Sequence, residues 1–338
     1  MVVVICRIGA GRIVLTGVED LLTRSRSAAT VAQWAEVHRL AVAGREPVIA
    51  RYVGARVARV WLRTSRFVDA DALATATLTL GPDAGAFYHL GWAQFATGRA
   101  RRALDSYERA LHLYREADDR AGEAVTLTNI GSVYDGLGDW QQALTYYQQA
   151  LPTLQEVGDR ANEAATLTNI GAVYHALGDW QQALTYHQQA LPTLQEADDR
   201  TSEAATLNNI GAVYHALGDR QQALTYYQRA LFIRRDVGDR AGEATTLSNI
   251  GGIRFQEGDL VGAGAALVDA VQVLRSIGDR GSEALASFNM AYLLLRMERV
   301  DDAIQFQRRA VALAEETSHP DLDQMRAFLS DLEQEQKG

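Results

Sequence analysis

The sequence has almost none of the residues that build covalent cross-links, cysteine metal clusters or nucleotide sites. Cys6 is the single cysteine, so neither an intramolecular disulfide nor a centre built from several cysteines can form. Lys337 is the single lysine, so a phosphate-binding loop that ends in Gly-Lys-Ser/Thr is absent. Schiff-base chemistry on a core lysine is excluded for the same reason. These absences argue against nucleotide hydrolysis and amine catalysis within this chain.

The sequence also lacks long hydrophobic runs and an even distribution of charge. The apolar stretch from Met1 to Ile8 is too short to span a bilayer, and we expect a cytoplasmic protein that does not bind membranes. Residues 1–66 hold eleven arginines against four acidic residues, although the formal net charge of the chain is -9. A basic N-terminal segment therefore precedes an acidic remainder, which is a poor candidate for nucleic-acid binding.

An internal repeat organises most of the chain. The hexapeptide at 129–134, Asn-Ile-Gly-Ser-Val-Tyr, returns 40 residues later at 169–174 as Asn-Ile-Gly-Ala-Val-Tyr and again at 209–214. The register extends upstream to Gly91 and downstream to Asn289-Met290-Ala291, which gives six units. A fixed period of this length indicates a stacked array of supersecondary units.

Each unit has the apolar spacing of two helices. In one unit, the apolar residues on one side of the first helix are Leu127, Ile130, Tyr134 and Leu137, and those of the second are Ala143, Leu144, Tyr147, Ala150, Leu151 and Leu154. Gly138 and Asp139 separate the helices, because glycine can end a helix in a left-handed conformation and aspartate can cap the next. The pattern predicts an antiparallel helix pair in every unit.

The motif Leu-x-x-Ile-Gly-x-x-Tyr, followed by Ala-x-x-x-Tyr-x-x-Ala, resembles the tetratricopeptide repeat (TPR). The unit is longer than the usual TPR and is similar to the long-repeat class of kinesin light chains and some bacterial regulators. The resemblance implies an all-α fold, a right-handed superhelical solenoid of antiparallel helix pairs, and a non-enzymatic protein-binding role without cofactors.

The chain divides into four predicted parts. Residues 1–66 form a basic, mostly helical segment with a possible short hairpin at 1–17, and 67–83 are the remnant of a degenerate repeat. Residues 84–314 hold the six units. Residues 315–338 contain a final helix that opens near Pro320 and caps the array, because an open solenoid end would expose its core.

One face of the first helices carries the functional prediction. We name it the amide strip; in units two to five it comprises 125, 128, 129, 132 and 136 and the equivalent positions 40, 80 and 120 residues later, and none of these residues is charged. By contrast, the same helices carry Glu123, Glu163, Glu203 and Glu243, which we assign to solvent. An uncharged strip with an asparagine in every repeat favours close contact with another backbone.

The resemblance to long-repeat TPR proteins implies that such asparagines line a concave groove and hold an extended peptide. The matching row is Asn129, Asn169, Asn209, Asn249 and Asn289, accompanied by Thr128, Thr168 and Asn208. A carboxamide has a donor and an acceptor, so it can bond both backbone groups of one peptide residue. The alternative is that the asparagines serve packing between repeats, since units two to four are near copies.

Aromatic residues occupy the two ends of the strip: Tyr88 and Trp92 in unit one, Phe288 and Tyr292 in unit six. They predict either side-chain pockets that give specificity, or packing under the terminal helices. His175 and His215 recur beside the strip, but repeats about 10 Å apart are too widely spaced for two imidazoles to share a zinc ion. We assign no metal and no catalytic residue.

Two further functions stay open. The chain is either a peptide-binding scaffold or the sensor portion of a signal-transduction ATPase whose catalytic domain lies elsewhere. The second is favoured if the N-terminal segment packs over the strip. Nucleic-acid binding through the arginine-rich segment is a third alternative, and it would require a strong loss of affinity with added salt. The sequence leaves the oligomeric state undetermined.

Overall fold

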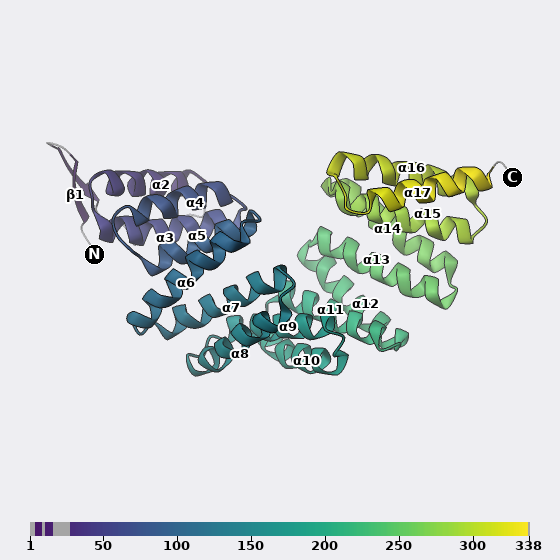
Figure 1. Cartoon of the computed structure of the whole chain (residues 1–338), viewed down its shortest axis with the longest axis horizontal. Helices are drawn as coiled ribbons and strands as arrows, with labels where there is room; N and C mark the ends of the chain where they lie inside the picture. The colour runs from purple at the N-terminus through teal and green to yellow at the C-terminus, as the bar shows by residue number, and fades with distance from the viewer. Residues whose placement is uncertain (1–3, 9–10, 16–27, 337–338) are drawn as a thin grey trace. The chain divides into compact units, whose positions relative to one another are not determined.

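The computed structural model describes residues 4–8, 11–15 and 28–336. These fall into two compact units, Met1–Asn169 and Ile170–Gly338, which we call the N-terminal and C-terminal units and describe separately. Apart from one two-stranded sheet, their secondary structure is helical, with consecutive helices packed side by side in chain order (Figure 1). The predicted all-α architecture of antiparallel helix pairs is confirmed.

The N-terminal unit begins with an antiparallel hairpin and continues with helices. Strands β1 (Val4–Ile8) and β2 (Gly11–Leu15) pair with Val4 opposite Leu15 and Ile8 opposite Gly11, so a hairpin is formed where one was predicted. The helices are α2 (Ala28–Ala43), α3 (Pro47–Arg63), α4 (Phe67–Leu78), α5 (Ala84–Ala96), α6 (Ala100–Glu116), α7 (Arg120–Gly136), α8 (Trp140–Glu156) and the first part of α9 (Arg160–Ala176).

The C-terminal unit contains the last turns of α9 and the remaining repeats. Its helices are α10 (Trp180–Glu196), α11 (Arg200–Ala216), α12 (Arg220–Val237), α13 (Arg240–Glu257), α14 (Leu260–Ile277), α15 (Arg280–Arg296), α16 (Val300–Thr317) and α17 (Leu322–Glu335). Helix α17 packs on α16 as the predicted terminal cap, although it begins at Leu322 and not at Pro320. Helix α8 runs unbroken through Pro152, and α10 through Pro192.

The predicted helix boundaries follow from local chemistry. Asp139 accepts a hydrogen bond from the backbone N–H of Gln142 at 3.2 Å, and Asp219 caps α12 in the same way. Gly138, with φ +78°, adopts the left-handed conformation that ends the preceding helix. These capping groups satisfy backbone donors that would otherwise lack a partner at the helix start.

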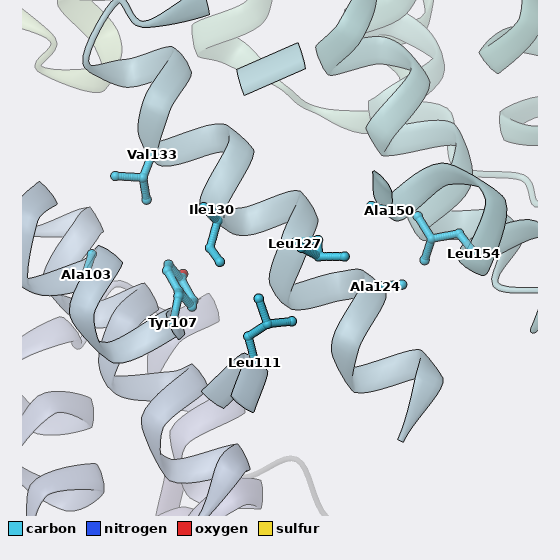
Figure 2. Close-up of a cluster of buried hydrophobic side chains, with 9 residues drawn as sticks. All are labelled: Ala103, Tyr107, Leu111, Ala124, Leu127, Ile130, Val133, Ala150 and Leu154. Atoms are coloured by element: carbon cyan, nitrogen blue, oxygen red, sulfur yellow. The ribbon is translucent and has the colours of Figure 1, made fainter. Parts of the chain in front are cut away.

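The core of the N-terminal unit lies between neighbouring helices. Leu127, Ile130, Ala150 and Leu154 in it were predicted, whereas the completely buried Val133 was not. Figure 2 shows Ala103, Tyr107 and Leu111 of α6 facing Leu127, Ile130 and Val133 of α7, with Ala150 and Leu154 of α8 beside them. Leu137 is an error in the predicted apolar side of α7, because it is 52% exposed. It lies just beyond the end of α7, where the chain turns at Gly138.

A glycine in the first helix of each of the first five repeats admits a large side chain from the second helix. A Cβ atom added to Gly131 would lie 2.7 Å from the Tyr147 ring, and one added to Gly211 would lie 2.8 Å from Tyr227. Tyr147 and Tyr227 are almost completely buried. The small residue is therefore required by close packing within the helix pair.

The glutamates that we assigned to solvent are mostly buried, which corrects that prediction. Glu163, Glu203 and Glu243 are between 3% and 6% exposed. Glu243 accepts from Arg235 of the preceding helix at 2.8 Å and also pairs with Arg240. Each such carboxylate ties one repeat to the helix before it, and its burial depends on this pairing.

The helices before the first clear repeat continue the same packing. Helix α3 contacts both α4 and α5, just as α5 contacts both α6 and α7. His38 of α2 and Thr77 of α4 are joined by a buried hydrogen bond of 2.8 Å. The boundary predicted at residue 66 thus divides two helices that pack as a pair.

Among the described residues, α14 is long and apolar enough to cross a membrane, by length and composition alone. It packs against α13 and α15, and Leu267, Val271 and Leu274 on it are buried. Its apolar character is that of a core helix in the repeat array.

Candidate functional site

The asparagines of the N-terminal unit donate to side chains of the preceding repeat. The Nδ2 of Asn129 donates to the Tyr88 hydroxyl at 2.8 Å, and the Nδ2 of Asn169 lies 3.5 Å from the Ser132 Oγ. Both asparagines are half-buried. Ser132 also accepts from the Tyr147 hydroxyl at 3.1 Å. The donors that were predicted to bind a peptide are therefore engaged in packing between repeats in this unit.

The threonines beside these amides also serve packing. Thr128 is 7% exposed, and its Oγ1 lies 3.0 Å from the Thr166 Oγ1 of the next repeat. Thr168 is half-buried and donates to the Ala164 carbonyl at 3.0 Å. Burial of Thr128 leaves little surface for a ligand, so we assign it to the contact between repeats.

The aromatic end of the N-terminal unit is packed against its neighbours. The Tyr88 ring lies 5.8 Å from Tyr107 and 6.5 Å from Trp92, and Trp92 joins the cluster formed by α3 and α4. His89 occupies the asparagine register but is 8% exposed, and burial lowers its pKa to about 4. Of the two predicted roles for Tyr88 and Trp92, packing under the N-terminal helices fits these contacts.

The asparagines of the C-terminal unit are less constrained. Within the residues that the structure describes, the side chains of Asn209 and Asn289 make no hydrogen bond, and Asn289 is exposed. The Nδ2 of Asn249 donates to the Asn208 Oδ1 at 3.3 Å, and this oxygen also accepts from Thr246 at 3.2 Å. Asn209 and Asn289 thus keep a donor and an acceptor for a ligand, whereas Asn208 joins two repeats.

The aromatic end of the C-terminal unit encloses a cavity. Phe288 and Tyr292 pack on Phe328 of the cap at ring distances of 5.6 and 5.8 Å, and Phe255 lies 5.9 Å from Tyr292. Packing under the cap is thus realised for Phe288, but Tyr292 is still 50% exposed. A cavity of about 190 Å³ lies between α13 and α15. Its lining consists of Ser248, Gly251, Gly252, Phe255, Leu267, Phe288, Asn289, Tyr292 and Leu293.

Ser248 and Gly252 of the cavity belong to the predicted strip, whereas Phe255, Leu267 and Leu293 were not predicted as site residues. Gly252 takes the position held by Ser132, Ala172 and Ala212 in the preceding repeats, and a Cβ added there would meet nothing within 4 Å. Its departure from the repeat was visible in the sequence. The place of Phe255 beside Tyr292, and of Phe328 on Phe288, depends on packing between helices and had no local signal.

The histidines beside and beneath the strip have different surroundings. The His215 Nε2 lies 3.0 Å from the Gln256 Oε1, and His175 is half-buried. His187, which replaces Tyr147 and Tyr227, is completely buried, and neither of its ring nitrogens has a partner in the described part of the chain. Burial lowers the pKa of His187 to about 4. No group of three or more His, Cys, Asp or Glu side chains suited to a metal occurs among the described residues.

The repeat spacing, glycine contacts and capping pattern agree with a family comparison. The tetratricopeptide repeat model matches residues 83–156, 162–236 and 242–316, which is well over half of the chain. The chain belongs to the tetratricopeptide repeat family. Proteins of this family are typically non-catalytic scaffolds that bind protein partners. A comparison with curated proteins finds no match.

Solved structures share the fold at low sequence identity. One is a signal transduction ATPase with numerous domains (STAND) from Pyrococcus horikoshii, which has a tetratricopeptide repeat sensor. It is 14% identical to this chain, and the similarity covers 93% of this chain with a TM-score of 0.74. The chain spans 48% of the length of that protein. A Rap protein complexed with Competence and Sporulation Factor is 14% identical with a TM-score of 0.58, and 91% of this chain and 99% of that chain are covered. BtubC (BKLC) from P. vanneervenii is 25% identical with a TM-score of 0.53, and the similarity covers 62% of this chain and 90% of that chain.

Proposed function

We propose that the chain is a non-enzymatic scaffold that binds an extended segment of another protein along the amide strip of its C-terminal unit. The observation that carries this proposal is the pair of carboxamides, on Asn209 and Asn289, without a side-chain partner in the described residues. Asn209 is half-buried, and a half-buried amide without a protein partner gains most from a ligand that supplies one; Asn289 is exposed and accessible to the same ligand. An extended backbone offers both an N–H and a C=O at every residue.

The absence of charge on the strip supports a backbone ligand. Thr245, Ser248, Asn249, Gly252 and Gln256 form the strip on α13, and none of them carries a charge. A partner side chain with a formal charge would lose hydration there without gaining an ion pair. The amides can hold a chain by its main-chain groups while other contacts select the sequence.

A direct test compares the asparagines of the two units. A phage-displayed library of random linear peptides is selected on the wild-type chain, and recovered peptides are measured by fluorescence anisotropy. We expect the triple variant Asn209→Ala, Asn249→Ala, Asn289→Ala to lose at least about tenfold in affinity, because about 1.4 kcal/mol corresponds to tenfold.

The matched control is the double variant Asn129→Ala, Asn169→Ala, whose donors are engaged within the protein. It is expected to bind the same peptides as well as the wild type does, with some loss of thermal stability. Circular dichroism establishes that both variants are folded. Equal affinity of the triple variant and the wild type would refute binding through these amides.

A second candidate function is the sensor portion of a signal-transduction ATPase. The observation that favours it is the similarity over 93% of this chain to a STAND protein with a tetratricopeptide repeat sensor. The lack of a Gly-Lys-Ser/Thr loop would place the nucleotide site outside these residues. Affinity purification of the tagged chain from its own cells tests this candidate: it requires recovery of an ATPase, and repeated recovery of none would reject it.

A further inference from the structure

We propose that the cavity between α13 and α15 is a specificity pocket for one large apolar side chain of the bound segment, flanked in that segment by an acidic residue. The inference rests on the proposed function and names the chemistry of its ligand. The cavity lies wholly within the C-terminal unit, and Asn289, whose amide lacks a partner in the described residues, forms part of its lining.

The size and lining of the cavity fit one apolar side chain. Its volume is about 190 Å³, and an apolar cavity of about 150 Å³ is large enough to bind benzene. Phe255, Tyr292, Leu267 and Leu293 contribute apolar walls, and no lining residue is charged. Ligand pockets commonly combine such walls with a few polar groups that fix orientation, and Ser248 and Asn289 provide these groups here.

The cavity borders an open position on α13, at Gly252. The position of Gly252 carries a side chain in each of the preceding four repeats, namely Trp92, Ser132, Ala172 and Ala212. At Gly252 the missing side chain leaves open space, whereas one residue earlier an added Cβ on Gly251 would lie 3.0 Å from Leu267. Gly252 is therefore a position at which an added side chain can enter the cavity without overlapping the protein.

The terminal helix fixes the wall of the cavity without filling it. Phe328 of α17 packs against Phe288 and Tyr292, but it does not belong to the lining. Because these rings are already held in place, they lose less side-chain entropy when a ligand binds. The pocket is consequently formed before the ligand arrives.

The positive charge of Arg296 favours an acidic residue beside the apolar side chain in the bound segment. Arg296 lies one helical turn beyond Tyr292 on α15, is exposed, and forms no ion pair within the described residues. An acidic residue next to the apolar one would complement this guanidinium. A basic neighbour would be repelled by it.

The test uses the peptides recovered from the random library and two substitutions at one position. Gly252→Leu places a side chain in the open space, and Gly252→Ala adds a single carbon there. We expect recovered peptides to share a Phe, Leu, Met, Trp or Ile with an adjacent Asp or Glu. Gly252→Leu should weaken their binding at least tenfold, as should replacing the shared apolar residue by alanine. Gly252→Ala should bind within about threefold of the wild type.

The outcomes separate this inference from the proposed function. Peptides that depend on Asn209, Asn249 and Asn289 but share no apolar residue, and that bind Gly252→Leu normally, would overturn the pocket and leave the amide contact standing. Absence of any amide-dependent peptide would overturn both. A shared apolar residue without an acidic neighbour, together with unchanged binding by Arg296→Gln, would overturn the role given to Arg296.

Discussion

In the N-terminal unit the asparagine donors have partners, and in the C-terminal unit two of the three asparagines have none among the described residues. Asn129 bonds to Tyr88 at 2.8 Å, but Asn289 is exposed and unpaired there. Both residues occupy one register of the repeat. The difference comes from the residue 41 positions earlier, which is a long phenol at Tyr88 and a short hydroxyl at Ser248. An identical residue is thus a packing group in one unit and a candidate ligand group in the other.

The same contrast holds one layer below the strip. The Tyr147 hydroxyl donates to Ser132 in the N-terminal unit. In the C-terminal unit, His187 takes the equivalent place beneath Gly171 and has no partner for either ring nitrogen in the described part of the chain. An unpaired buried polar group weakens the fold. At this position the N-terminal unit has a hydrogen-bonded hydroxyl, on Tyr147, whereas the C-terminal unit has a buried imidazole, on His187, without a partner in the described residues.

The largest expected effect comes from glycines that are closely packed in both units. Gly131→Ala and Gly211→Ala should each lower the free energy of unfolding by about 2 kcal/mol, because the added Cβ overlaps the Tyr147 or Tyr227 ring. Gly252→Ala should raise it by up to about 1 kcal/mol through helix propensity alone. Urea denaturation measures all three, and a destabilised Gly252→Ala would show that this part of the C-terminal unit is closed as well.

An effect of comparable size, confined to acidic pH, is expected from His187. Its folded pKa of about 4 lies below the ordinary 6.5, so the unfolded chain binds the proton first. Stability is fully present above pH 6.5 and is lost as the pH falls toward 4; at pH 5 the loss from this group is about 2 kcal/mol. His187→Tyr should remove that loss while leaving stability at pH 7.5 within about 1 kcal/mol of the wild type.

The measurement for His187 is denaturation at a series of pH values between 7.5 and 4.5. Burial also lowers the pKa of His38 and His89, but these residues are present in both proteins and cancel in the difference. Parallel curves for wild type and His187→Tyr would mean that His187 finds a partner or water in solution.

The smallest effect concerns the hydrogen bond between Asn129 and Tyr88, which distinguishes the N-terminal unit from the C-terminal unit. Tyr88→Phe should cost about 1 kcal/mol, because the Asn129 donor loses its partner. A double-mutant cycle between Tyr88→Phe and Asn129→Ala should give a coupling of about 0.5 to 1.5 kcal/mol. The corresponding cycle between Ser248→Ala and Asn289→Ala should give none. Equal coupling in both units would remove the distinction between them.

Much of the fold was predicted because its signals are local. The break predicted at Gly138 and Asp139 is confirmed, because Gly138 has φ +78° and Asp139 caps the following helix through the Gln142 N–H. Leu137 and the glutamates were misassigned for a different reason. Exposure at a helix end depends on where the chain turns, and burial of Glu243 depends on Arg235 from another helix.

From the sequence, the candidate site could be predicted only as a set of equivalent positions in the repeats. The sequence placed an asparagine in five of the six repeats and aromatic residues at both ends, but Thr128 is buried against Thr166. Gly252 departs from the repeat, yet its meaning depends on Phe255, Phe288 and Tyr292 around it. The contact of Phe328 in α17 with Phe288 in α15 depends on tertiary packing and has no local signal in the sequence.

By itself, the sequence determined the period, the helix pairs, their aspartate caps and the small residue at Gly131, since each depends on residues a few positions apart or on a motif repeated along the chain. Tertiary structure alone decided which carboxamides are already engaged and where a cavity remains. Those outcomes depend on side-chain length across neighbouring repeats, such as Tyr88 against Asn129 at 2.8 Å. Hydrogen bonding and close packing act over a few ångströms, so contacts about 40 residues apart appear only when the helices are stacked.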